Sequence, residues 1–295
     1  MTNLDAMRSS APDPLRRRAT IAVVFAGGDP VDADEHRRLR LAIHHAEPER
    51  LVVIAADSGL HAAQADGWPV DIVVGDLDSV APGRLVQAEA AGARLDRHPP
   101  AKDATDLELA LDSALDAGAD QIVVAGGHGG RLDHFLANLL LLGADRLASA
   151  SVSAILGPAW MHVVREQVRW TAARGDLVTL LPLHGRVTGV TTTGLLYPLD
   201  GATLLPGSTR GVSNEHVGGE ASVSVASGVL AVVVPGAAGV HVDAGDRAGS
   251  ATPSAPGDRS EPAELPELPE PPEPPELHEL PELPEPPEPG GPRVP

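Results

Sequence analysis

Two aspartates stand two residues apart, directly after an apolar run. Asp76 and Asp78 follow Ile72–Gly75, a segment typical of a buried strand. Strand geometry would aim side chains at i and i+2 the same way, so the two carboxylates are expected to lie together. Like charges held this close are costly unless a cation compensates them, and Mg²⁺ is the usual partner for carboxylates and substrate phosphates. The pair therefore predicts a metal site, although a solvated polar turn is the alternative for such a pair taken alone.

Three further acid-bearing segments surround this pair. Asp57 follows the apolar run Leu51–Ala56, and Asp106 opens an amphipathic helix. A glycine-rich segment at 126–134 follows the apolar run Gln121–Ala125. Strand, acid-bearing turn and helix in repetition predict a parallel sheet whose chemistry lies at the carboxyl ends of its strands.

The glycine-rich segment has the composition of a phosphate-binding loop. Gly129 and Gly130 would let backbone N–H groups approach a phosphate closely, and Arg131 supplies a forked donor. Asp133 either holds Arg131 or the water shell of a metal, or else caps the helix predicted to begin at His134. A Walker-type kinase is disfavoured because the chain has no G-x-x-x-x-G-K-[ST] sequence.

These motifs, in this order and spacing, resemble the thiamine pyrophosphokinase family. The resemblance extends from about Ile21 to Pro235. The segments that carry it are Ala56–Gly59, Gly75–Ser79, Lys102–Asp106, Gly129–His134, Thr191–Tyr197 and Gly211–Glu215. The resemblance implies that the β,γ-pyrophosphoryl group of ATP is transferred to the hydroxyl of thiamine, giving thiamine diphosphate and AMP. A non-catalytic thiamine or nucleotide sensor on the same fold is the alternative.

The resemblance also implies roles for the acids. Asp76 and Asp78 would hold Mg²⁺, while Asp57 and Asp106 would form a second acidic layer that ligates directly or through water. Asp106 is in addition the candidate base for the thiamine hydroxyl. A carboxylate beside a metal stays ionised, so it would act mainly by orientation.

The substrate contacts follow from the same resemblance. Contacts to ATP are assigned to Lys102, Thr105, Gly129, Gly130, Arg131 and Asp133. For thiamine, Tyr197 would offer an aromatic face, in a place where relatives often have Trp. Ser213 and Asn214 would bond the aminopyrimidine, with a plain turn as the alternative. The resemblance further implies a homodimer in which one subunit's β domain completes the site on its partner's sheet domain.

Composition excludes several other classes of function. The absence of Cys removes disulfides and thiolate zinc sites, and the net charge of −19 argues against a nucleic-acid partner. No apolar stretch reaches the roughly 20 residues that a membrane span needs. Arg16–Arg18 before an apolar run faintly suggests an export signal, but the run is short. The expected location is the cytoplasm.

The chain is predicted to divide into four parts. A disordered arm at 1–18 precedes a Rossmann-like α/β nucleotide-binding domain at 19–150, and a smaller all-β sandwich that binds thiamine follows at 151–242. Helices are predicted at Asp34–Ala46, Pro82–Ala91 and His134–Leu147, the last largely buried. Strands in the second domain are predicted at Ser153–Leu156, Trp160–Val164, Val168–Thr171, Leu177–Leu181, Gly185–Thr192, Ala221–Ala226 and Val229–Val234.

The last part, 243–295, is a low-complexity tail that is predicted to be disordered. Glu recurs at every third position from Glu261 to Glu288, with Pro and Leu between. Pro density favours polyproline II, whose three residues per turn would align the Glu side chains along one edge. A solubilising appendage and a docking strip for an unknown basic or Pro-binding partner are the two interpretations.

Overall fold

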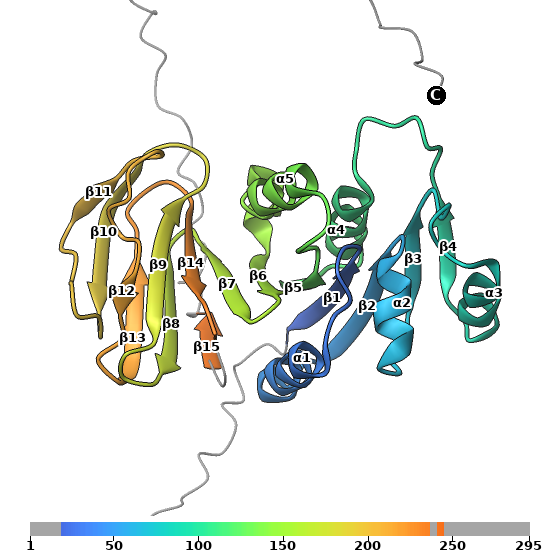
Figure 1. Ribbon diagram of the computed structural model, residues 1–295, viewed down its shortest axis with the longest axis horizontal. Helices are drawn as coiled ribbons and strands as arrows, with labels where there is room; N and C mark the ends of the chain where they lie inside the picture. The colour runs from blue at the N-terminus through green and yellow to red at the C-terminus, as the bar shows by residue number, and fades with distance from the viewer. Residues whose placement is uncertain (1–18, 237–240, 245–295) are drawn as a thin grey trace, which may run out of the picture. The chain divides into compact units, whose positions relative to one another are not determined.

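The first half of the chain alternates strands and helices (Figure 1). The computed structural model describes residues 19–236 and 241–244, so the predictions for the arm and for the tail beyond Ala244 lie outside the described residues. The elements of the first half are β1 (Thr20–Ala26), α1 (Ala33–Ala46), β2 (Arg50–Ala56), α2 (Gly59–Ala65), β3 (Ile72–Gly75), α3 (Pro82–Ala90), β4 (Arg94–Arg97), α4 (Asp106–Asp116), β5 (Gln121–Gly126) and α5 (Leu132–Leu142).

Strands follow one another through the second half. A short 3₁₀ turn, η1 (Asp145–Ser149), separates α5 from the first of them. The strands are β6 (Ser151–Leu156), β7 (Ala159–Val164), β8 (Gln167–Ala172), β9 (Leu177–Pro182), β10 (Val187–Thr193), β11 (Ala202–Leu204), β12 (Asn214–Glu215), β13 (Gly219–Ser224), β14 (Leu230–Val234) and β15 (His241–Ala244). All seven strands predicted for this half are present, with ends shifted by a few residues.

Within the described residues, one long sheet contains strands from both halves. Its order is β12-β9-β14-β7-β6-β5-β1-β2-β3-β4. Strands β6 through β4 in this order pair in parallel, and the β7, β14, β9 and β12 pairings are antiparallel. β1 lies between β5 and β2, so the loops after β1 and β5 leave the sheet where the strand order changes direction. Open α/β sheets bind their ligands at such a point.

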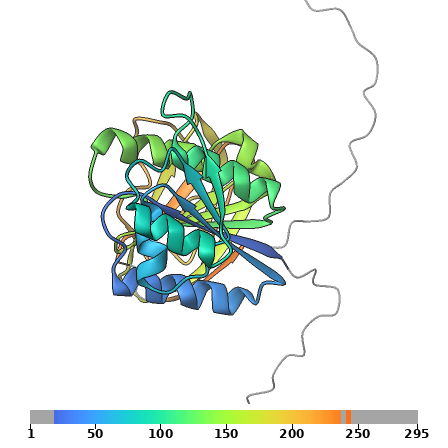
Figure 2. The same cartoon turned by 90° about the vertical axis from the view of Figure 1, so that its right-hand side faces the viewer.

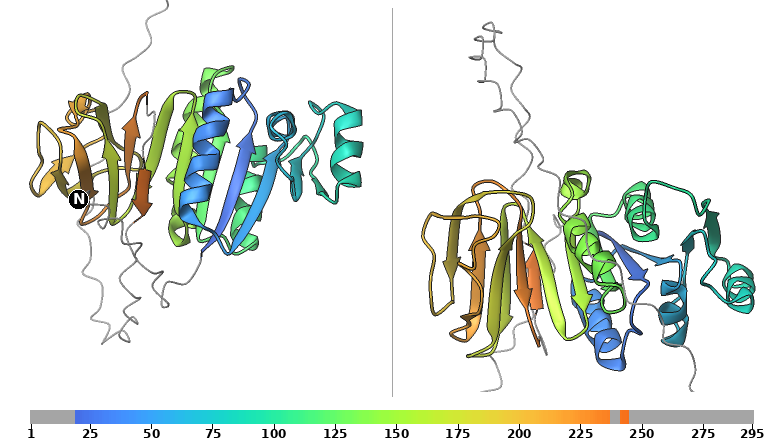
Figure 3. Two further views of the ribbon diagram at one scale, coloured as in Figure 1. Left: turned by 90° about the horizontal axis from the view of Figure 1, so that it is seen from below. Right: turned by 45° about the horizontal axis from the view of Figure 1, so that its top comes forward.

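Helices cover both faces of the parallel part (Figures 2 and 3). Val23 and Phe25 of β1 pack in one buried cluster with Leu39 of α1. Val24, on the opposite side of the same strand, packs in another cluster with Leu111 of α4. Strand residues alternate between faces, and both faces of β1 are buried, so its sequence is continuously apolar.

The second half forms the predicted sandwich, but one of its two sheets is not separate. A second sheet is antiparallel and has the order β11-β10-β13-β8-β15. Its residues Trp170 and Val223 share a buried cluster with Leu180 and Val232 of the long sheet. The mixed α/β fold with a second β layer is confirmed. The long sheet runs across the predicted division at residue 150, because β6 pairs in parallel with β5. The division into two domains stays a prediction.

The prediction of a largely buried helix over His134–Leu147 was wrong. α5 ends at Leu142, and the 3₁₀ turn follows. Leu132, Leu136 and Leu140 are 68%, 51% and 49% exposed. They recur every four residues and so form one stripe on the helix, while Leu142 is buried in the core on the other side. Apolar composition showed that this helix needed a partner surface, but not that the sheet can cover only one side of it.

Two further features differ from the expectations. Asp243, where the tail was predicted to begin, lies within β15, which pairs with β8 from His241 to Ala244. Strand pairing therefore continues past the predicted boundary, to Ala244. The edge strand β4 was not predicted, because its sequence Arg-Leu-Asp-Arg has little apolar character and its residues are only partly buried or exposed. Among the described residues, no helix is long and apolar enough to cross a membrane.

Candidate active site

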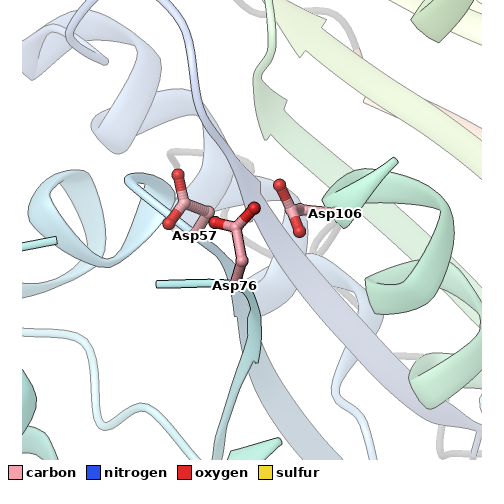
Figure 4. Close-up of side chains that lie close together, drawn as sticks. All are labelled: Asp57, Asp76 and Asp106. Atoms are coloured by element: carbon pink, nitrogen blue, oxygen red, sulfur yellow. The ribbon is translucent and has the colours of Figure 1, made fainter. Parts of the chain in front are cut away.

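Three carboxylates from three different segments converge at one edge of the sheet (Figure 4). Asp57 follows β2, Asp76 follows β3, and Asp106 is the first residue of α4. Each offers an oxygen atom, and these atoms all lie within 4.8 Å of one another. The carboxyl ends of adjacent parallel strands meet at the same sheet edge, which brings together acids that are up to 49 residues apart in the sequence.

Gly75 makes this convergence sterically possible. Its φ is +139°, and a Cβ atom there would lie 2.8 Å from Asp106 Oδ1 and 3.3 Å from Asp57 Cβ. A side chain at this position would therefore strain the backbone and push the carboxylates apart. The Asp57 N–H also donates to the Val74 carbonyl at 2.8 Å, which ties the turn after β2 to β3.

Lys102 balances part of the negative charge. Its Nζ lies 2.8 Å from Asp106 Oδ1 and 3.4 Å from Asp76 Oδ2, and its side chain is 13% exposed. Burial works against the charged form of Lys102, but hydrogen bonding and attraction to the two carboxylates raise its pKa. Burial likewise opposes ionisation of Asp76, yet the Asp78 backbone N–H and Lys102 hold the pKa of Asp76 below its usual value. Lys102 therefore places an ammonium group against two of the clustered carboxylates.

Asp78 lies outside the group of three. β3 ends at Gly75, and the buried Leu77 adopts a left-handed φ of +62°, so the strand geometry expected for Asp76 and Asp78 does not apply. Asp78 is exposed, and the charge of Asp76 is the main cause that raises its pKa. Ser79, one residue on, donates its hydroxyl to Asp57. The structure thus groups Asp76 with Asp57 and Asp106, the predicted second layer, whereas Asp78 interacts with Asp76 but is not part of this group of three.

The glycine-rich loop after β5 packs against the loop after β1. The Asp29 N–H donates to the His128 carbonyl at 2.9 Å. Gly129 has φ +70°, and a Cβ atom there would lie 1.9 Å from Asp29 Oδ2, so this close approach requires glycine. The loop lies where the strand order changes direction, as expected for a phosphate site. Asp29 was not among the candidate residues, although the sequence Gly27–Pro30 after the first strand was the available signal.

Arg131 and Asp133 form an exposed ion pair at the end of this loop. Arg131 Nε donates to Asp133 Oδ1 at 3.1 Å. Arg131 lowers the pKa of Asp133 to about 2 through this hydrogen bonding. α5 begins at Leu132 with Arg131 at its N-cap, so the interpretation of Asp133 as a helix cap is wrong. Thr105 does cap α4, because its Oγ1 accepts the Glu108 N–H at 3.2 Å.

The thiamine candidates lie at the far end of the long sheet. Tyr197 is 64% exposed, whereas Asn214 of β12 is buried. Asn214 Nδ2 donates to the Tyr197 carbonyl at 2.7 Å, and its Oδ1 accepts the N–H groups of Tyr197 at 3.0 Å and Glu215 at 2.9 Å. The amide of Asn214 thus holds the backbone that presents Tyr197. Ser213 is exposed, has a left-handed φ of +56°, and donates its N–H to Thr179 Oγ1 at 3.1 Å.

The two candidate regions are well separated within one chain. Asn214 belongs to β12 at one edge of the long sheet, and Asp57 follows β2, seven strand-to-strand steps away. At the usual spacing of neighbouring strands, this corresponds to roughly 30 Å. The structure therefore brings together Asp57, Asp76, Asp106 and Lys102, but not these acids with Tyr197, Ser213 and Asn214.

A carboxylate cluster and a glycine-rich loop at the carboxyl ends of one parallel sheet are typical of α/β enzymes that act on phosphates. Comparison with known proteins specifies the class further. Residues 44–151 match the family model for the thiamin pyrophosphokinase catalytic domain, and residues 162–230 match that for the thiamin pyrophosphokinase vitamin B1 binding domain. The chain belongs to the thiamine pyrophosphokinase family, which confirms the resemblance seen in its motifs.

Individual relatives agree with this assignment. The thiamine pyrophosphokinase of Bacillus subtilis is 30% identical over 167 residues, which cover 54% of this chain and 75% of the relative. A crystal structure of thiamine pyrophosphokinase from Bacillus subtilis superposes with a TM-score of 0.61 at 27% identity, covering 73% of this chain and 98% of that one. One from Geobacillus thermodenitrificans gives 0.59 at 25% identity, with 74% and 98% covered. The non-catalytic alternative has no support among these relatives.

Proposed function

We propose that this chain transfers the β,γ-pyrophosphoryl group of ATP to the hydroxyl of thiamine in a Mg²⁺-dependent reaction. The observation that carries the proposal is the convergence of Asp57, Asp76 and Asp106 within 4.8 Å. Transfer of phosphoryl groups depends on positioning and electrostatic stabilisation more than on a protein nucleophile. A site built from carboxylates, a lysine and a glycine-rich loop with an arginine has the groups that such catalysis requires.

The carboxylates fit a magnesium ion. They supply hard oxygen ligands, and Asp57 Oδ1 is buried with no hydrogen-bond partner in the described part of the chain. Asp57, Asp76 and Asp106 would hold the ion, with Asp78 reaching it through water. When bound, the ion would neutralise charge on the phosphate oxygens.

The remaining polar groups have distinct roles in the proposal. Without substrate, Lys102 pairs with Asp76 and Asp106. Once Mg²⁺ compensates the charge of these carboxylates, Lys102 would turn to a phosphate oxygen. Arg131 and the N–H groups of Gly129 and Gly130 bind the outer phosphates, with Asp133 holding the guanidinium. Asp106 accepts a hydrogen bond from the thiamine hydroxyl and orients it. A carboxylate is a weak base toward an alcohol, so orientation is its main contribution.

The thiamine half of the site is supplied by a second copy of the chain. A single thiamine molecule cannot span the roughly 30 Å between β12 and β2 that strand spacing gives. Exposed apolar residues also adjoin the thiamine candidates, because Leu177 and Leu181 flank Thr179, the partner of Ser213. With the exposed leucine stripe of α5, they form apolar surface that a homodimer would bury.

Tyr197, presented by the Asn214 clamp, would stack on the thiamine rings. Ser213 keeps its hydroxyl for the aminopyrimidine, since its contact to Thr179 uses only the backbone N–H. Asn214 acts on the substrate chiefly through Tyr197, because its amide is already engaged. A cytoplasmic location remains a prediction from the sequence.

One paired measurement tests the proposed function. Purified full-length protein is incubated with ATP, thiamine and Mg²⁺, and AMP and thiamine diphosphate are quantified in parallel with calorimetric titration of thiamine. Stoichiometric appearance of both products, dependent on Mg²⁺, is expected. Thiamine binding without AMP release would show a sensor. Thiamine monophosphate with ADP, in place of thiamine diphosphate with AMP, would show attack at the γ-phosphorus.

A further inference from the structure

Two charged residues of α1 are buried beneath the glycine-rich loop. Glu35 and Arg38 are 2% and 7% exposed, whereas Asp34 and Arg37 of the same helix are exposed. Charged side chains are seldom buried to this degree unless several partners compensate them. Neither residue belongs to the carboxylate cluster, so the reason for their burial lies in the contacts that they make.

Glu35 joins three segments of the chain. Its Oε2 accepts the Asp32 N–H at 2.8 Å, which completes a capping box at the start of α1. Its Oε1 accepts the N–H of Gly157, in the turn between β6 and β7, at 2.8 Å. The same Oε1 lies 3.8 Å from Nδ1 of His128, in the loop after β5. One buried carboxylate therefore links α1, the β6–β7 turn and the glycine-rich loop.

Arg38, three residues after Glu35 in α1, also binds the turn between β6 and β7. It donates to the carbonyl oxygens of Gly157 at 2.5 Å and Pro158 at 3.0 Å. Gly157 thus has both its N–H and its carbonyl bound to α1. The turn cannot shift relative to the helix without breaking buried hydrogen bonds to charged groups, which are among the stronger ones in proteins.

His128 connects the fixed Gly157 turn to the glycine-rich loop. A Cβ atom on Gly157 would lie 3.2 Å from His128 Nε2, so the imidazole ring packs directly against the turn. Its Nδ1 is buried and has no hydrogen-bond partner among the described residues, and Glu35 is the carboxylate it faces. The His128 carbonyl accepts the Asp29 N–H. His128 is therefore held on both its side chain and its backbone, one residue before Gly129.

We propose that Glu35 is a positioning residue for the phosphate-binding loop. Through His128, and through the turn that Arg38 also holds, it fixes the backbone of Gly129 and Gly130 and the origin of Arg131 before ATP arrives. A preformed loop binds phosphates without first losing conformational entropy, so its main effect is on ATP affinity. This inference rests on the proposed role of the loop in binding ATP.

The test compares steady-state constants of matched variants of the full-length protein. Glu35→Gln keeps a residue type that can serve in a capping box, but it removes the charge and one acceptor. We expect the KM for ATP to rise about tenfold, the effect of losing one buried charged hydrogen bond. The expected kcat and the KM for thiamine stay within about twofold, because the acids and Tyr197 are untouched. Asp34→Asn, an exposed change in the same helical turn, is the control and should alter neither constant.

A double-mutant cycle shows whether Glu35 acts through His128. His128→Gln alone should raise the KM for ATP, and adding it to Glu35→Gln should cost less than the sum of the two effects, since residues that act as a unit are not additive. His128→Gln leaves the contacts between α1 and the Gly157 turn intact, so it carries the test if Glu35→Gln does not fold. Fully additive effects, or equal increases in the KM values for ATP and thiamine, would overturn the inference.

Arg131→Ala separates this inference from the proposed function. If Arg131→Ala raises the KM for ATP while Glu35→Gln and His128→Gln do not, the loop binds ATP and the positioning role is refuted. If Arg131→Ala leaves the KM for ATP unchanged, the loop is not the phosphate site, and both the inference and that part of the proposed function fail.

Discussion

The acids after β2 and β3 converge with Asp106 at one edge of the sheet, whereas Tyr197 stands exposed beside β12 at the opposite edge. The first region has its own counter-charge in Lys102 and a glycine that allows close approach. The second has a buried clamp, Asn214, that fixes the backbone but leaves the aromatic ring uncovered. One chain thus supplies part of the counter-charge for its acidic cluster, but it leaves the candidate substrate-facing aromatic ring exposed.

This difference indicates which half of the site can form alone. An acidic cluster must be neutralised wherever it is built, because uncompensated charge would destabilise the folded chain. An exposed aromatic ring costs little by itself and gains its energy when another surface covers it. We infer that the metal-binding half is preassembled in each subunit and that the thiamine half is completed on dimerisation.

The largest expected effect comes from the acidic cluster. Asp76→Asn removes a charge that pairs with Lys102 and that would bind the proposed Mg²⁺, so kcat should fall at least about 100-fold, as for loss of a principal electrostatic group. Asp78→Asn should cost less, because Asp78 is exposed and outside the group of three. Asp103→Asn, an exposed change in the same loop as Lys102, serves as the control. Initial rates of AMP release at saturating Mg²⁺ measure all three variants. Equal losses of kcat for the Asp76 and Asp78 variants would support the sequence-based prediction that these two residues together hold the metal.

Mixed dimers test the comparison directly. Chains carrying Asp76→Asn and chains carrying Tyr197→Ala are each expected to be nearly inactive. If each site combines the acids of one chain with the tyrosine of its partner, every mixed dimer contains one intact site. Random mixing should then restore about a quarter of wild-type activity per chain. No recovery in mixtures shown to contain mixed dimers would mean that each site lies within one subunit.

A smaller effect is expected from acid pH on folding stability, through a histidine in a strand between the two regions. His162 of β7 is fully buried, and burial lowers its pKa to about 4 from 6.5. Below pH 6.5 the unfolded chain therefore binds a proton that the folded chain rejects, so folding stability decreases as pH falls from 6.5 toward 4. The loss is at most about 3 kcal/mol.

Thermal melts across this range measure the effect. His162→Leu should flatten the pH dependence of the Tm, whereas His44→Gln, a change at an exposed histidine, should leave it as in the wild type. An unchanged slope in His162→Leu would show that other groups are responsible for acid destabilisation.

The smallest effect is expected from shortening the chain. Because β15 pairs with β8 up to Ala244, a truncation after Ala244 preserves the second sheet. We expect kcat, both KM values and the oligomeric state to stay unchanged in this variant. A truncation after Gly236, which removes β15, is the matched comparison and should lower the Tm. A several-fold loss of activity after Ala244, with a normal Tm, would place part of the catalytic machinery in the tail.

Local sequence was sufficient for several features. The continuously apolar runs of β1, β2 and β5 predict a sheet buried on both faces, and the acids that follow them predict chemistry at its edge. The motifs around Asp57, Asp76 and Asp106 were enough to indicate the family. The glycine-rich loop before Arg131 was also evident. These are properties of short segments, in which neighbouring residues determine conformation and chemistry.

Other features were decided only by the tertiary structure. Whether α5 is covered depends on how much of the sheet remains free beside it, and the continuation of the sheet through β6 depends on pairing with a distant strand. Asp106 joined the carboxylate cluster in preference to Asp78 because Leu77 turns the backbone, which residue spacing does not reveal. The burial of Glu35 arises from contacts with Gly157, 122 residues away. Such contacts depend on packing between distant segments, so a local sequence pattern cannot predict them.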